Sequence, residues 1–168
     1  MLKGVGVAEV AAALMLIVLI LLAALHPAAA QQQPIGFSHR AHIEKARMQC
    51  TDCHEGAASR DAAGIPSIRK CMLCHQFIGK DLPEIVRLTE FWDRKHEVPW
   101  VRVYGFKREA AVQFRHAPHA RAGIECNRCH GDVGSMTVAS KAVRHTMGTC
   151  IDCHRQRSAS DDCLACHY

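Results

Sequence analysis

Residues 126–130 read Cys-Asn-Arg-Cys-His, and this five-residue pattern decides how the rest of the chain must fold. The spacing Cys-x-x-Cys-His occurs five times, at Cys50–His54, Cys71–His75, Cys126–His130, Cys150–His154 and Cys163–His167. Two thiols of each motif can add to the vinyl groups of one haem, and the adjacent histidine can bind its iron from one face. The sequence therefore predicts five covalently attached haem c groups.

The motifs account for every cysteine of the chain. These ten predicted attachment residues are Cys50, Cys53, Cys71, Cys74, Cys126, Cys129, Cys150, Cys153, Cys163 and Cys166. Structural zinc is also held by Cys-x-x-Cys pairs, but zinc gives no reason for a histidine after every pair. Five such coincidences have a chance probability on the order of one in a million. A disulfide framework needs no histidines, so haem attachment is the preferred interpretation.

Composition supports an interior built largely by cofactors. After about thirty N-terminal residues, about 138 remain, too few to bury five haems in a conventional hydrophobic core. Only two Trp, two Tyr and five Phe occur among 168 residues, which agrees with porphyrins supplying the large apolar surfaces. We expect a mainly α fold with much irregular loop.

The formal charge of the polypeptide is +5, and five ferric haems would roughly cancel it, because each carries about −1 with both propionates ionised. The sequence contains no cluster of basic residues interleaved with aromatic residues, so nucleic-acid binding is not expected.

The N-terminal segment, residues 1–30, predicts export from the cytoplasm. Residues 5–25 are apolar except for Glu9, and as a helix they would span roughly 31 Å, about the thickness of a bilayer core. This length favours a retained transmembrane anchor, whereas the small residues 28–30 favour cleavage of a signal peptide. We expect the retained anchor, with the haem-bearing part at the periplasmic, outer face of the cytoplasmic membrane.

The exported part divides into two haem-rich blocks and an insert. We predict a dihaem block over residues 31–76, a cysteine-free insert over 77–112 and a trihaem block over 113–168. Each block opens with Phe-x-His-x-x-His, beginning at Phe37 and Phe114, followed shortly by Cys-x-x-Cys-His.

The insert has its own secondary-structure signals. Asp81, followed by Pro83 and Glu84, predicts a helix start, and the apolar periodicity continues to about Lys95. Beyond it, residues 98–104 and 110–114 are predicted to pair as a short hairpin. Trp92 and Trp100 are expected to pack in a core, or otherwise on haem edges or a partner.

The number of histidines predicts two imidazoles on every iron. The proximal ligands are His54, His75, His130, His154 and His167. Excluding His26 at the end of the apolar segment, six histidines remain for five distal positions: His39, His42, His96, His116, His119 and His145. Methionine is the alternative ligand, and the candidates near haem sites are Met48, Met72, Met136 and Met147, of which Met147 is the most plausible.

The paired histidine motifs ahead of Cys-x-x-Cys-His resemble the small class III multihaem cytochromes, and residues 113–168 resemble their three-haem version throughout. The resemblance implies that His116 pairs with His130, His119 with His154 and His145 with His167. By extension, His39 would pair with His54 and His42 with His75, which leaves His96 as the open alternative for the second haem.

A longer stretch is similar to the pentahaem subunit of alternative complex III and to related periplasmic quinone reductase complexes. It comprises Gln33-Pro34-Ile35, Phe37-Ser38-His39-Arg40, Pro99-Trp100-Val101-Arg102-Val103 and Phe114-x-His. The chain departs from that subunit at Tyr104, where a histidine is expected.

These features predict an electron-transfer protein and no catalytic residue. An iron bound by two histidines has no open position for a substrate, so its chemistry is outer-sphere electron transfer. The expected partners are membrane oxidoreductase subunits and other redox proteins, with the quinone pool reached indirectly. The alternatives are a multihaem reductase with one five-coordinate haem and a membrane-anchored quinol dehydrogenase.

Overall fold

The computed structural model describes residues 14, 15, 17 and 33–168 and separates the chain into two units, residues 1–32 and 33–168. The N-terminal anchor or signal helix predicted for residues 1–30 lies outside the described residues, except for three helical positions, Leu14, Met15 and Ile17. Among the residues that could be searched, no helix combines the length and the apolar character needed to cross a bilayer.

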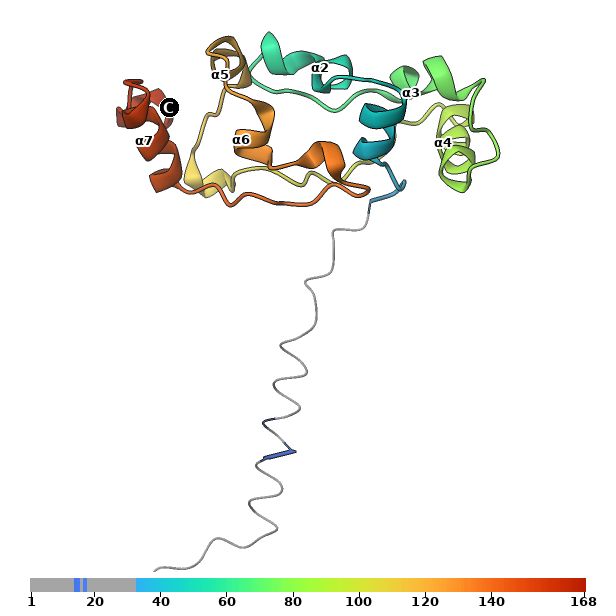
Figure 1. Ribbon diagram of the computed structural model, residues 1–168, viewed down its shortest axis with the longest axis horizontal. Helices are drawn as coiled ribbons and strands as arrows, with labels where there is room; N and C mark the ends of the chain where they lie inside the picture. Colours follow the sequence, from blue (N-terminus) through green and yellow to red (C-terminus); the bar gives the residue numbers. More distant parts are fainter. Residues whose placement is uncertain (1–13, 16, 18–32) are drawn as a thin grey trace, which may run out of the picture. The chain divides into compact units, whose positions relative to one another are not determined.

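The unit 33–168 is built from short helices joined by long irregular connections (Figure 1). The α-helices are α2 (Cys50–Cys53), α3 (Ile68–His75), α4 (Pro83–Asp93), α5 (His116–Arg121), α6 (Cys126–His130) and α7 (Met147–Gln156). A π-helical turn and four 3-10 turns complete them: η1 (Ala41–Lys45), η2 (Glu55–Ala58), η3 (Arg108–Ala110), η4 (Val133–Ser135) and η5 (Cys163–Ala165). The expectation of a mainly helical, loop-rich fold is confirmed.

Most of these helices coincide with the cysteine motifs. Residues three and four apart share one face of a helix, so a helical Cys-x-x-Cys-His segment presents two thiols and an imidazole on the same side. Four of the five motifs lie in or at the end of α2, α3, α6 and α7, and the fifth adopts the tighter turn η5. At the start of α7 the side chains of Thr146 and Thr149 bond each other's backbone amides and close the N-terminus.

The longest helix, α4, confirms the helix predicted in the insert. It begins at Pro83, whose missing amide proton costs nothing in the first turn, and Leu82 rather than Asp81 occupies the capping position. The Glu84 carboxylate accepts a hydrogen bond from the backbone amide of Gly36 at 2.5 Å. This contact ties the insert to the start of the dihaem block.

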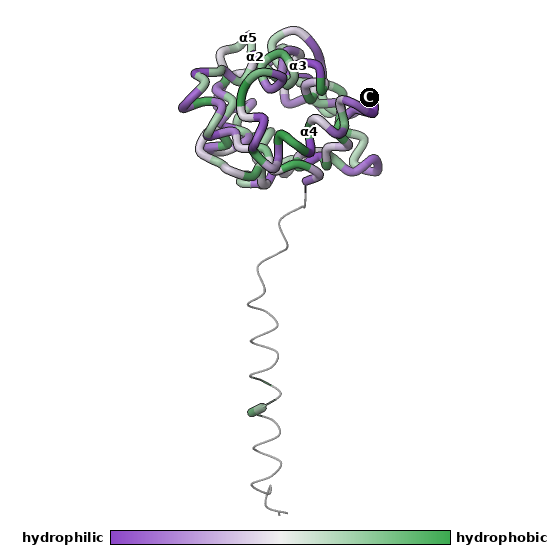
Figure 2. Tube along the Cα trace, turned by 90° about the vertical axis from the view of Figure 1, so that its right-hand side faces the viewer, coloured by the Kyte–Doolittle hydropathy of each residue, from purple (hydrophilic) through white to green (hydrophobic). Residues whose placement is uncertain are grey.

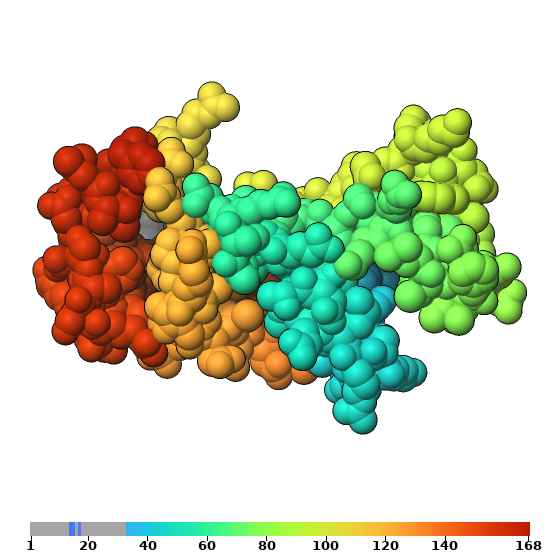
Figure 3. Space-filling model, turned by 90° about the horizontal axis from the view of Figure 1, so that it is seen from above, coloured from blue at the N-terminus to red at the C-terminus, as the bar shows by residue number. Residues whose placement is uncertain are grey.

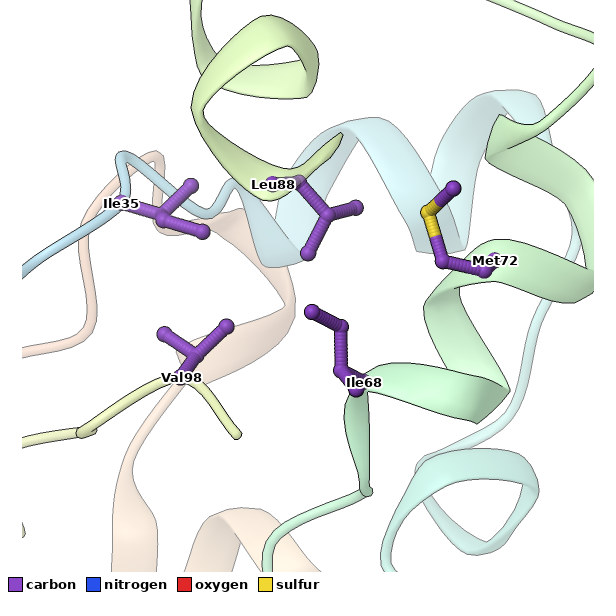
Figure 4. Packing of buried hydrophobic residues seen from close by; sticks show 5 residues of the cluster. All are labelled: Ile35, Ile68, Met72, Leu88 and Val98. Carbon is purple, nitrogen blue, oxygen red and sulfur yellow. The ribbon is translucent and has the colours of Figure 1, made fainter. Parts of the chain in front are cut away.

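A small hydrophobic cluster joins the insert to the dihaem block (Figure 4). Its five buried side chains come from α3, α4 and the segments before and after them: Ile35, Ile68, Met72, Leu88 and Val98. Trp100 packs against this cluster, as expected for a core tryptophan, whereas Trp92 is 41% exposed.

The hairpin predicted between residues 98–104 and 110–114 is wrong. The side-chain amide of Gln33 takes the place of a neighbouring strand, because it donates to the Val101 carbonyl at 2.8 Å and accepts from the Val101 amide at 3.0 Å. Val112 instead forms an isolated antiparallel bridge with His167. Residue pattern alone does not reveal that a glutamine side chain occupies the hydrogen-bonding edge.

Buried side chains are scarce elsewhere in the described residues. Apart from the cluster, only Ala117 is a buried hydrophobic residue, and no polar side chain is fully buried. Hydrophobic and hydrophilic residues alternate along the trace of residues 33–168 instead of separating into an inside and an outside (Figure 2). The polypeptide by itself therefore buries little apolar surface, as expected if cofactors complete the interior.

Candidate functional site

Four histidines of the cysteine motifs each face a histidine from another segment. The ring centroids are 6.4 Å apart for His39 and His54, 6.0 Å for His42 and His75, 6.3 Å for His116 and His130, and 5.9 Å for His119 and His154. Below, sites 1 to 5 denote the five Cys-x-x-Cys-His motifs in chain order. The four pairs belong to sites 1 to 4.

The spacing of these pairs fits one metal ion between two imidazoles. An imidazole nitrogen binds a transition metal at about 2.0–2.1 Å, so two rings on opposite sides of one ion have centroids about 6 Å apart. The observed range of 5.9–6.4 Å agrees with this spacing. The residues present therefore fit a haem iron with two axial histidines at sites 1 to 4.

Hydrogen bonds select the tautomer that such an iron requires. Nδ1 faces a backbone carbonyl in six of the eight paired histidines: His42, His54, His75, His116, His119 and His154. A carbonyl only accepts, so Nδ1 carries the proton and Nε2 keeps its lone pair for a metal. The backbone thus orients six rings with Nε2 free, the state that a metal ligand needs.

His39 is the paired histidine most isolated from water. Its Nδ1 is buried and has no hydrogen-bond partner within the described residues. Burial, followed by the nearby imidazoles of His54 and His42, lowers the pKa of His39. A neutral ring is the form that binds iron, so the surroundings of His39 favour the ligand state.

One phenylalanine in each block packs against two histidines that were predicted as distal ligands. Phe37 lies 4.9 Å from the ring of His39 and 4.4 Å from that of His42. Phe114 repeats the arrangement, at 4.8 Å from His116 and 4.6 Å from His119. The Phe-x-His-x-x-His pattern thus places two histidines on one helical turn and packs a phenyl ring against both.

None of the ten cysteines is paired in a disulfide. Burial raises the pKa of the thiols of Cys71 and Cys129. Nowhere in the described part do three His, Cys, Asp or Glu side chains converge as a ready-made metal site.

Site 5 differs from the other four. The motif is held at the backbone, where His167 bridges to Val112 and the Cys166 carbonyl accepts a hydrogen bond from the Gln113 amide at 2.8 Å. The predicted partner, His145, lies 6.4 Å from His130, with the two rings inclined at 75°. No ring pair joins His145 to His167 in the described residues, and their pairing stays a prediction.

Tyr104, the departure noted in the sequence, connects the trihaem block to the insert. Its hydroxyl accepts hydrogen bonds from the amides of Ala142 and Val143 at 2.9 and 3.0 Å and donates to the His130 carbonyl at 3.3 Å. Its ring lies 4.7 Å from that of His130 and 5.3 Å from that of His145. Sequence reasoning missed this role, which no local pattern signals.

The histidines predicted as ligands differ from His96 in their exposure to solvent. All ten histidines predicted as ligands are partly buried, whereas His96 is exposed in a cleft beside Trp92. For site 2, the structure brings His42 beside His75. Of the methionine candidates, Met72 belongs to the hydrophobic cluster and Met147 is 69% exposed.

An open cleft of about 420 Å³ beside site 1 gathers positive charge. It is lined by Cys53 of the motif, by the cations Arg60, Arg69 and Lys70, and by Glu55, whose carboxylate forms an ion pair with Lys70 at 2.8 Å. Guanidinium and ammonium groups are matched to carboxylates such as haem propionates. This cationic lining was not predicted from the sequence, because it forms only where Arg60, after η2, comes near Arg69 and Lys70 of α3.

Comparisons with known proteins agree with this site. Residues 22–99 match the class III cytochrome C family, and residues 112–168 match cytochrome c7 and related cytochrome c. The chain is also 30% identical, over 167 aligned residues, to the multiheme cytochrome c subunit of menaquinone reductase from Nitratidesulfovibrio vulgaris, strain Hildenborough. This alignment covers 82% of the chain and 77% of the relative. The chain therefore belongs to the multihaem cytochromes c of the class III type.

Proposed function

We propose that this chain is a pentahaem c-type cytochrome that carries electrons between a quinone-linked membrane complex and other redox partners. The observation that carries the proposal is the set of four imidazole pairs with centroids 5.9–6.4 Å apart, each joining a motif histidine to a distant segment. Site 5 has the same covalent motif and supplies the fifth haem.

The chemistry supplied by a bound haem is one-electron transfer at its iron. The protein contributes the ligands, their tautomers and their orientation. Backbone carbonyls, such as those of Gly64 and Asp61, accept hydrogen bonds from Nδ1–H of His54 and His116 and leave Nε2 free, so that these two nitrogens would bind the iron. Two imidazoles on one iron exclude water and substrates from it, so no catalytic acid or base is required.

The proposed partners follow from the relative's name. That protein is the multiheme subunit of a menaquinone reductase, and the alignment covers most of both chains. We assign this chain a corresponding position beside membrane oxidoreductase subunits, on the outer face of the cytoplasmic membrane. The apolar residues 5–25 are proposed as its anchor.

Two measurements on the purified full-length holoprotein test the proposal. Intact mass and the haem-to-protein ratio should give five haems per chain, and the ferric electron paramagnetic resonance spectrum should show low-spin iron. Reduction by a menaquinol analogue should occur only when the membrane fraction or a partner complex is present. Fewer than five haems, or zinc without porphyrin, contradicts the assignment.

The coordination of the iron at site 5 distinguishes the proposed electron carrier from a multihaem reductase. A reductase needs an iron with an open position, and the ring of His145 lies against Tyr104 and His130 instead of forming a described pair with His167. Carbon monoxide added to the ferrous protein decides between the two functions. We expect no binding, whereas stoichiometric binding at one haem favours the reductase.

A further inference from the structure

The two haem-rich blocks meet through site 1 and site 3, although site 2 stands between these two motifs in the sequence. Within each block, one short helical turn carries the distal histidines of two sites. His39 and His42 serve sites 1 and 2, and Phe37 contacts both rings. Sites 1 and 2 are joined again by the Lys70–Glu55 ion pair at 2.8 Å. These two sites are therefore neighbours.

Sites 3 and 4 are neighbours for the same reason. Helix α5 carries His116 and His119, which face the motif histidines of sites 3 and 4. Phe114 lies against both rings.

The contact between the blocks is made by the loop that follows site 1. The backbone carbonyl of Asp61 accepts hydrogen bonds from both the amide and Nδ1 of His116, at 3.0 and 2.9 Å. The carbonyl of Arg60 accepts from the Ala117 amide at 3.1 Å. The distal ligand of site 3 is thus positioned by the loop of site 1.

A second set of contacts joins the same two sites. The Arg40 amide, beside the distal ligand of site 1, donates to the Met136 carbonyl just after site 3 at 3.1 Å. Sites 1 and 3 are therefore neighbours as well.

Site 5 extends the row at the other end. It follows site 4 closely in sequence. The Cys166 carbonyl and His167 are bonded to Gln113 and Val112, directly ahead of Phe114, whose ring lies 4.6 Å from that of His119 at site 4. The helices that carry sites 2, 1, 3 and 4 follow one another in this order along the unit: α4 lies at one end, and α3, α2, α6 and α7 come after it (Figures 1 and 3).

We infer that the five attachment sites stand in single file in the order 2, 1, 3, 4, 5. This spatial order differs from the order of the motifs in the sequence. The difference arises because site 1 of the dihaem block, and not site 2, contacts the trihaem block. Sites 2 and 5 are the ends of the row. Of the large hydrophobic side chains described, Phe77, next to site 2, and Leu164, inside site 5, are the most exposed, at 74% and 73%. The ends are therefore the places for redox partners. This inference rests on the proposed haem content.

Nuclear magnetic resonance on the fully reduced holoprotein tests the order, because low-spin ferrous haems are diamagnetic. Each haem is assigned through its thioether and axial-histidine protons. Overhauser contacts between haems should link sites 2 and 1, 1 and 3, 3 and 4, and 4 and 5. A direct contact between sites 2 and 3, or no contact between sites 1 and 3, overturns the inference. The haem count of the same sample and its reduction by partners test the proposed function separately.

Matched ligand variants give a second readout on the intact protein. His39→Met at site 1 and His42→Met at site 2 should each raise the reduction potential of their own haem. Charge on one haem is felt most by its neighbours. His39→Met should therefore shift the midpoints of two other haems, at sites 2 and 3, and His42→Met only that of site 1. An equal shift at site 3 in His42→Met contradicts the order.

Discussion

Replacing Tyr104 by phenylalanine removes one oxygen atom and three hydrogen bonds. The hydroxyl serves the amides of Ala142 and Val143 and the carbonyl of His130. A hydrogen bond contributes about 0.5–1.5 kcal/mol net to stability. The contact to His130 is long at 3.3 Å and Ala142 is exposed to solvent. We therefore expect a total loss of about 2 kcal/mol, near the lower part of the range for three bonds.

This loss is measurable in two ways. For a domain of this size, 1 kcal/mol corresponds to about 2–4 °C in melting temperature, so Tyr104→Phe should melt about 4–8 °C below the parent. Hydrogen exchange at residues 142–145 should accelerate, because the hydroxyl holds this segment against site 3. The low-spin resonance signal of site 3 should also shift, since the His130 carbonyl loses its donor.

The chain contains a matched control. Tyr168 is its only other tyrosine. Its ring is 59% exposed and lies below Arg115, whose guanidinium carbon is 5.3 Å from the ring centroid. Tyr168→Phe should leave the melting temperature and the exchange of residues 142–145 unchanged. Equal effects of the two substitutions, or no effect of Tyr104→Phe on exchange, would refute the role given to the Tyr104 hydroxyl.

Three further outcomes follow from the geometry. His42→Ala should leave the site 2 iron open to carbon monoxide, and His96→Ala should not, as the ferrous visible spectrum will show. Leu88→Ala should lower the unfolding free energy by about 2–5 kcal/mol, because Leu88 is 4% exposed in the only hydrophobic cluster described. Denaturant unfolding measures this loss, and a loss below about 1 kcal/mol contradicts the prediction. Burial lowers the pKa of His39, so the unfolded chain binds a proton that the folded chain does not; thermal melts between pH 7 and 5 should show stability falling as the pH drops below about 6.5.

Parts of the fold were predictable because their causes are local. The helix of the insert follows from Pro83 and a run of periodic apolar residues, and it was found at Pro83–Asp93. The hairpin prediction failed because strand pairing depends on what occupies the edge, and here the edge is taken by Gln33. The predicted pairing of His145 with His167 stays untested for a similar reason, since both positions depend on distant segments.

The sequence alone determined the cofactor class and the points of attachment, because thioether formation and proximal ligation involve only five consecutive residues. It also indicated which histidines were available as distal ligands. Only the tertiary structure decided that His42 stands beside His75 while His96 stays exposed, and that Asp61 of one block orients His116 of the other. The pairing of each motif histidine with a second histidine depends on contacts between residues far apart in the chain. The spatial order of the sites depends on such contacts as well, and they arise only when the backbone folds back on itself.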